Sequence, residues 1–265
     1  MTFLKTTAAF CTIATLAACG GGGDDPIEEA TFENLTTSTE TAIAIQAFQQ
    51  VSGGFTVSSA TGTYDATTDI ATIDSSDISS DGASDLTGSL SYVAALSGAG
   101  DNRIVIAPTA AADVPTGAAS YTGRSQFTVV VAGGANAGTY DGEMDVTLDI
   151  SIGSSSSATL TIDGLVDGDA TVTPVGSPTA AYTATGSEEI VFNGLSISGG
   201  TISDGGSSTA SVTGFGDASE SLNLTGASID VIAGLAGPAA EEMGGVGTIN
   251  DATAGSVRTT FSGSK

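Results

Sequence analysis

The sequence predicts an all-β protein built from many short strands joined by tight turns. The chain has 265 residues and 37 glycines, it is rich in Thr, Ser and Val, and it has no long run of helix-forming residues. Such a composition favours pleated strands and turns. Because 40% of the residues are hydrophobic, the chain is not disordered by composition.

The first predicted β-rich part comprises residues 31–112. Thr41–Phe48 is compatible with a strand or a short helix, and 97–102 has the composition of a turn. The Ser- and Asp-rich stretch 74–87 is expected to be a mobile loop. The other strands expected in this part are 55–57, 70–73, 89–93 and 103–107.

The second part, residues 118–265, carries the clearer strand signal. Phe127, Val129 and Val131 alternate with their neighbours, and from 140 to 152 the side chains alternate between a mainly apolar and a polar face. An unbroken period of two cannot be a helix and predicts a long strand with one wet face. A turn after Gly153 and a second alternating run at 158–163 then predict a hairpin.

The remaining strand signals in this part are short. They lie at 170–173, 189–192, 195–198, 209–213, 221–225, 227–232 and 256–261. A meander of strands with one buried face is expected to close into a barrel, because a closed barrel has no edge strands that could template aggregation. At about eight strands, side chains fill the interior without a channel. A two-sheet sandwich is the alternative.

The N-terminus predicts a secretory signal over residues 1–18. Lys5 is followed by an apolar stretch, 8–16, which is shorter than the roughly 20 apolar residues that span a bilayer. Leu16, Ala17, Ala18 and Cys19 together resemble the bacterial lipobox. The resemblance implies cleavage before Cys19 and acylation of that cysteine. An ordinary secretion signal with an incidental cysteine is the alternative.

Residues 19–30 are interpreted as the lipidated cysteine and a Gly-rich tether. A single acyl chain binds membranes only reversibly, so the three chains implied for Cys19 would give a permanent anchor. Gly20, rather than Asp, follows the cysteine. In well-studied Gram-negative bacteria an Asp there retains a lipoprotein at the inner membrane. The resemblance therefore implies a lipid-anchored protein of the outer membrane, facing the periplasm or the surface.

Composition excludes several classes of function. Cleavage removes Lys5 and no acid, so the mature chain has four basic and 30 acidic residues and a formal net charge of −26. Nucleic acid and anionic head groups need a basic face, so neither is an expected partner. The chain has no histidine, and its only other cysteine, Cys11, lies in the signal. These absences exclude His- or Cys-based catalysis and zinc sites. We expect no enzyme, no metal and no cofactor.

Two groups of acidic residues are the remaining candidates for chemistry. They are Asp141, Glu143 and Asp145 on one strand face, and Asp163, Asp167 and Asp169 around a turn. Clustered carboxylates suit Ca²⁺, but neither group has EF-hand spacing, so solvated charge is the preferred interpretation. Asp145 and Asp149 lie about 13 Å apart along a strand, which is too far for a glycosidase pair.

A Gly-rich segment near the C-terminus resembles the C-terminal signature of the transferrin-binding protein B family. The family pattern is Gly-x-Phe-Tyr-Gly-Pro-x-Ala-x-Glu-x-Gly-Gly-x-Phe. The residues that match it are Gly237, Pro238, Ala240, Glu242, Gly244 and Gly245. Leu235, Ala236 and Gly247 depart from it, because the family favours aromatic residues there. Residues 115–123 also resemble the segment that leads into the first barrel strand of smaller relatives.

The resemblance covers residues 115–265 and implies a fold. That fold is an eight-stranded antiparallel β-barrel, residues 113–265, preceded by a smaller β-rich handle subdomain, residues 31–112. One such unit equals one lobe of the larger transferrin-binding proteins. Transferrin binding is not carried across, because the host-binding loops have no matching motif here.

We interpret five of the matching residues as a structural turn motif: Gly237, Pro238, Glu242, Gly244 and Gly245. Gly237-Pro238 predicts a turn, and 239–243 predicts one helical turn. The glycine pair is expected to supply backbone angles that are closed to other residues. This motif is expected to support the fold rather than to bind a ligand.

The predicted function is that of an outer-membrane lipoprotein acting as a non-catalytic binding module for an unknown protein or solute. The alternative is a structural or shielding acidic surface lipoprotein without a specific ligand. A carboxylate-based hydrolase is the third hypothesis.

Overall fold

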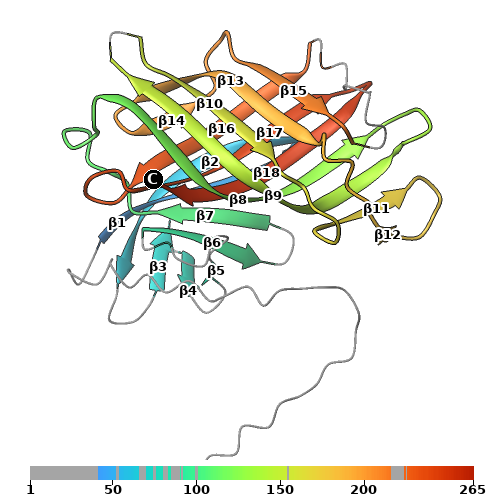
Figure 1. Ribbon diagram of the computed structural model, residues 1–265. Helices are drawn as coiled ribbons and strands as arrows, with labels where there is room; N and C mark the ends of the chain where they lie inside the picture. The colour runs from blue at the N-terminus through green and yellow to red at the C-terminus, as the bar shows by residue number, and fades with distance from the viewer. Residues whose placement is uncertain are drawn as a thin grey trace, which may run out of the picture.

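The computed structural model describes residues 41–51, 54–65, 70–73, 76–79, 83–84, 90, 92–98, 101–153, 155–215, 224 and 226–265. The strands are β1 (Thr41–Val51), β2 (Gly54–Asp65), β3 (Ile70–Ile73), β4 (Ser76–Ser79), β5 (Ala83–Ser84), β6 (Val93–Gly98), β7 (Asp101–Ile106), β8 (Gly117–Val131), β9 (Gly138–Ile152), β10 (Ser157–Asp163), β11 (Ala170–Pro174), β12 (Ala180–Ala181), β13 (Glu189–Ser198), β14 (Thr201–Ser203), β15 (Thr209–Thr213), β16 (Ser228–Ala236), β17 (Glu242–Asp251) and β18 (Gly255–Ser264). They form two sheets, of seven and eleven strands (Figure 1). No helix occurs in the ranges given, so the all-β prediction is confirmed.

The larger sheet closes into the predicted eight-stranded antiparallel barrel. The ring runs through β8, β9, β10, β13, β14, β16, β17 and β18, and β18 pairs with β8 to close it. Outside the ring, β11 pairs with the first half of β9 and β15 with the first half of β13. The alternative of a two-sheet sandwich is therefore wrong.

The strand predicted at 140–152 is β9, and its burial follows the predicted alternation. Tyr140, Met144 and Leu148 are buried, whereas Asp141 and Asp145 are exposed. β9 pairs with β8 along its whole length and forms the predicted hairpin with β10.

Side chains fill the barrel. The largest fully buried ones on its strands are Tyr121, Phe192, Phe261, Met144, Leu148, Leu160, Ile162, Ile190 and Leu195, and they belong to one continuous core. An interior packed in this way leaves the outer surface and the two mouths of the barrel as places for a ligand.

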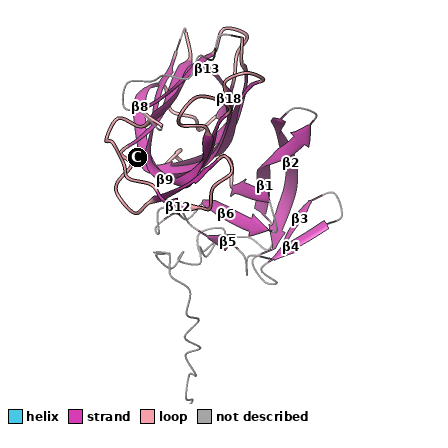
Figure 2. Cartoon of the chain, turned by 90° about the vertical axis from the view of Figure 1, so that its right-hand side faces the viewer, coloured by secondary structure: helices cyan, strands magenta, loops and turns pink. Residues whose placement is uncertain are grey.

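The smaller sheet, β1–β7, packs against the outside of the barrel, and we call it the handle sheet. Its strand order is β4-β3-β2-β1-β7-β6-β5, and both views show it beside the barrel (Figures 1 and 2). Val93, Ile104 and Ile106 of the handle sheet form a buried cluster with Ala236 of β16 and Val246 of β17.

Several boundaries in the handle sheet differ from the sequence prediction. Thr41–Phe48 belongs to strand β1 and is not helical. The strand predicted at 89–93 starts only at Val93, because pairing of β6 with β7 runs from Val93↔Ile106 to Gly98↔Asp101. The turn predicted at 97–102 is shorter than expected, because 97–98 belong to β6 and 101–102 belong to β7. The predicted loop at 74–87 contains β4 and β5, and its other residues lie outside the described part.

Two predictions in the second part also need correction. The strands predicted at 189–192 and 195–198 are one strand, β13, which continues through a register shift where Gly194 has a φ of 69°. Residues 237–240 form a turn, and β17 begins at Glu242, so 239–243 is not a helical turn. The strand predicted at 221–225 lies outside the described residues apart from Leu224, which is not in a strand.

Candidate functional site

The predicted anchor and tether lie outside the described residues. They comprise Leu16, Ala17, Ala18, Cys19 and the Gly-rich stretch that follows, so lipidation stays a prediction. Where the structure does describe the chain, it contains no helix long and apolar enough to cross a membrane.

The turn motif lies where the barrel meets the handle sheet. Gly237 follows β16 with a φ of 84°, an angle that favours glycine, and its carbonyl oxygen accepts a 2.7 Å hydrogen bond from Thr109 Oγ1. Glu242 is buried, and its Oε2 accepts a 2.7 Å hydrogen bond from the backbone N–H of Tyr92. Pro238 is exposed.

The glycine pair of the motif faces two different layers. A Cβ on Gly244 would lie 2.6 Å from Val93 Cγ1 in the handle sheet, and a Cβ on Gly245 would lie 2.6 Å from Phe261 Cζ in the barrel core. Neither glycine is among those with a positive φ. The expectation of special backbone angles is therefore wrong for this pair. Close packing on both faces of β17 is what requires glycine there.

The same turn is fastened to the barrel interior by Tyr121. Its hydroxyl donates a 2.8 Å hydrogen bond to the carbonyl oxygen of Ala240, which has a φ of 54°. Burial first, and the charge of Glu241 second, raise the pKa of Tyr121 to about 12. The phenol therefore stays protonated as a donor at neutral pH. These contacts favour the structural interpretation of the motif.

Arg124 of β8 brings members of the two predicted acidic groups together. Its guanidinium lies 2.9 Å from Asp145, 3.4 Å from Asp169 and 3.6 Å from Glu143. Burial alone would lower the pKa of Arg124, but the hydrogen bond and charge of Asp145, helped by Asp169 and Glu143, raise it above its ordinary value. One cation is thus shared by three carboxylates, so it offsets part of their charge, and they are not merely solvated.

The other predicted acids do not converge on one point. Asp141 accepts a 2.7 Å hydrogen bond from Thr128 Oγ1, and Asp167 accepts one of 2.8 Å from the N–H of Ala184. Asp163 lies opposite Asp145 on the neighbouring strand, and Asp149 is exposed. Within the described ranges, no group of three or more His, Cys, Asp or Glu residues is placed to hold a metal ion.

Replacing Arg124 by Gln is expected to lower the free energy of unfolding by about 1 kcal/mol, because partly exposed ion pairs contribute little each. The substitution also removes the counter-charge of Asp145, which lies opposite the like-charged Asp163 on the adjacent strand. Urea unfolding at low and high salt measures the effect, and the loss should shrink at high salt. An equal loss at both salt concentrations would contradict the electrostatic explanation.

Sequence reasoning missed Glu188, an acidic residue that is only 3% exposed. Its Oε1 accepts hydrogen bonds from Tyr182 Oη at 2.8 Å, Thr185 N at 2.7 Å and Thr185 Oγ1 at 2.8 Å. Its Oε2 accepts hydrogen bonds from Gly186 N at 2.9 Å and Ser187 N at 3.1 Å. The residues Thr-Gly-Ser before Glu188 are a sequence signal for a turn. Glu189 follows directly, however, so the sequence does not show which of the two carboxylates the turn binds.

The Glu188 loop secures an aromatic cluster at the end of the barrel where β9 begins. Tyr182 packs edge-on against Tyr140, with ring centroids 5.2 Å apart, and Phe215 joins Tyr140 to Phe127 at 5.8 and 5.4 Å. Burial alone would raise the pKa of Glu188, but the hydrogen bonds from Thr185 and Tyr182 lower it below its ordinary value. The loop therefore binds its own carboxylate as an anion.

Comparison with known proteins shows the fold of a transferrin-binding protein B lobe. No family model and no curated protein matches the chain. A double mutant of transferrin-binding protein B from Haemophilus parasuis Hp5 superposes with a TM-score of 0.52 at 16% identity, over 84% of this chain and 44% of that one. Intact Ap-TbpB, with its N and C lobes, gives 0.50 at 16% identity, over 85% and 46%.

The chain thus spans less than half the length of these solved structures. At such identity the likeness establishes the fold and leaves the ligand open. The fold expectation drawn from the Gly237–Gly245 resemblance is confirmed.

Proposed function

We propose that the chain is a lipid-anchored, non-catalytic binding module of the outer membrane, with a protein or a solute as its ligand. The likeness of most of this chain to transferrin-binding protein B carries the proposal. The filled barrel supports it as well, because a rigid scaffold presents its loops and outer faces to a partner. The acidic surface favours a partner with a basic face.

Transferrin is the first analyte to test, because the similar structures are named for binding it. The chain carrying Cys19→Ala, which has no site for the lipid, would be immobilised and titrated with transferrin and with a panel of other purified extracellular proteins. Saturable binding that is lost when the immobilised chain is unfolded supports the proposal. Folded protein without saturable binding to any analyte would favour the shielding alternative.

Cys19→Ala is also expected to release the protein from membranes, because the implied lipid is attached to that thiol. Membrane fractionation followed by a high-salt wash measures the release. A matched Thr15→Ala change within the signal should leave the protein in the membrane pellet. Sedimentation of the Cys19 variant with outer membrane after the wash would contradict the anchor.

A further inference from the structure

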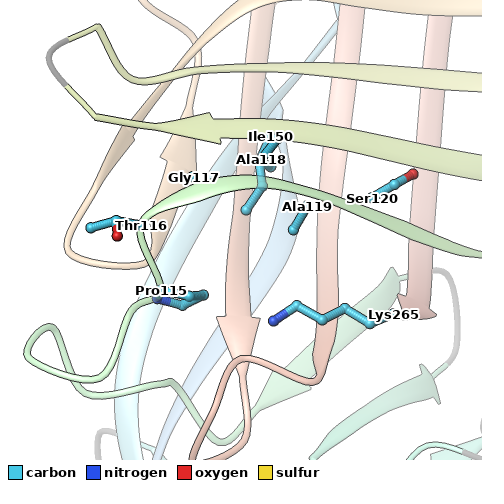
Figure 3. A pocket seen from close by; sticks show the side chains of 8 residues that line it. All are labelled: Pro115, Thr116, Gly117, Ala118, Ala119, Ser120, Ile150 and Lys265. Atoms are coloured by element: carbon cyan, nitrogen blue, oxygen red, sulfur yellow. The ribbon is translucent and has the colours of Figure 1, made fainter.

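A hollow of about 400 Å³ opens at the mouth of the barrel where β8 begins. Pro115, Ala118, Ala119 and Ile150 give it an apolar lining, and Lys265 extends along it (Figure 3). Ile150 belongs to the buried barrel core, and Ala119 packs against that core. The hollow therefore rests on the filled interior.

Lys265 is the only residue with a charged side chain in the lining of this hollow. Figure 3 shows its ammonium group directed toward Pro115. Nζ donates a 3.2 Å hydrogen bond to the carbonyl oxygen of Ala239 and lies 5.5 Å from the centre of the Tyr121 ring. Within the described part of the chain the ammonium has no carboxylate partner. Because an ammonium has three donors, two remain for a ligand.

Two other polar groups near this mouth, Tyr121 and Glu241, already have hydrogen-bond partners, whereas Thr116 and Ser120 are exposed residues of the lining. The Tyr121 hydroxyl donates to Ala240, and its raised pKa keeps it protonated. Glu241 accepts a 3.0 Å hydrogen bond from the N–H of Ala239 at Oε2. A ligand would thus meet the Lys265 ammonium, the hydroxyls of Thr116 and Ser120, and an apolar floor, which together complement an anionic group joined to an apolar body.

We propose that this mouth binds a small organic anion with an apolar body, such as a medium-chain carboxylate. The anionic end pairs with Lys265, and the apolar body covers Ala118, Ala119 and Ile150. The volume of the hollow lies in the range of small-molecule sites. Such sites are mostly apolar with few polar groups, and they often occupy the mouths of β-barrels. The site does not depend on the protein partner proposed above, and either can exist without the other.

Octanoate is the probe, and uncharged octanamide of the same chain length is its matched control. The chain carrying Cys19→Ala, labelled at its Ala and Ile methyl groups, would be titrated with each compound and followed by NMR. We expect saturable octanoate shifts at Ala118, Ala119 and Ile150, with octanamide at least about tenfold weaker. Lys265→Gln should remove that difference, and Lys265→Arg should restore it. Ala118→Leu should fill the hollow and weaken both compounds.

Three outcomes would overturn the proposal. The first is no saturable shift up to about 10 mM octanoate, ten times the concentration that half-saturates a site with a Kd of about 1 mM. The second is equal affinity for octanoate and octanamide, because it would exclude a role for the carboxylate charge of the ligand. This comparison needs no variant of the protein. The third is a set of shifts centred on the other mouth, at Ala132, whose separate hollow has no charged side chain in its lining. Thermal melts verify that each variant is folded.

Discussion

Replacing Gly245 by Val is expected to lower the free energy of unfolding by at least about 2 kcal/mol, through overpacking of the core. The new Cβ would lie 2.5 Å from Ala233 Cβ, 2.6 Å from Phe261 Cζ and 2.7 Å from the carbonyl oxygen of Ile232. Phe261 and Ala233 are 0% and 1% exposed, so neither can swing aside into solvent. β17 must shift, and it is bonded to β16 and β18 along its length.

Urea unfolding of the variant beside Gly133→Val separates this cause from a general effect of valine. Gly133 lies in the loop between β8 and β9, and a Cβ there has nothing within 4 Å. Its substitution should change the free energy of unfolding by less than about 0.5 kcal/mol. If Gly245→Val kept full stability but lost an otherwise measurable ligand, the motif would be a binding site and not a packing element.

The long strand β9 could be predicted because one face packs into the barrel while the other is wet. Met144, Val146 and Leu148 of that buried face recur at every second position, and this periodicity is a local property of the sequence. Closure of the sheet into a barrel could be predicted from the number of such strands. The edges of β6 could not be predicted in the same way, since its pairing with β7 decides them, and Ala94, Ala95 and Gly98 of β6 have low strand propensity.

The candidate site was less accessible to sequence reasoning, because its contacts depend on register and on distant segments. Arg124 meets Asp145 through the pairing of β8 with β9, and it meets Asp169 only because a loop folds back over that pair. The glycine pair matched a family pattern, but its physical reason is the approach of Val93 and Phe261 from opposite sides. No local sequence pattern predicts that these two side chains pack against the glycine pair.

Replacing Glu188 by Gln is expected to lower the free energy of unfolding at neutral pH by about 2–4 kcal/mol. The carboxylate accepts from Tyr182, Thr185, Gly186 and Ser187 with both oxygens. An amide replaces one acceptor with a donor, so the donors to at least one of the two oxygens lose their partner. Hydrogen bonds to charged groups contribute about 1.5–3 kcal/mol each.

The loss should depend on pH in a defined direction. Since the pKa of Glu188 in the folded protein lies below its ordinary value of 4.5, its ionised form contributes stability above that pH. This contribution disappears as the pH falls through the folded-state pKa. The difference in unfolding free energy between the unmodified chain and Glu188→Gln should therefore be largest near neutral pH and should narrow in acid.

Urea unfolding at pH 7 and at successively lower pH measures that difference, with Glu189→Gln as the matched control. Glu189 is the next residue, is partly exposed and starts strand β13, so it reports the same change of charge outside the loop. The other carboxylates titrate alike in both chains and cancel from the difference. A loss that stays constant down to acidic pH would mean that Glu188 acts by shape alone. Equal losses for Glu188→Gln and Glu189→Gln would remove the special role of the buried carboxylate, and the aromatic cluster around Tyr182 would then have to hold this end of the barrel unaided.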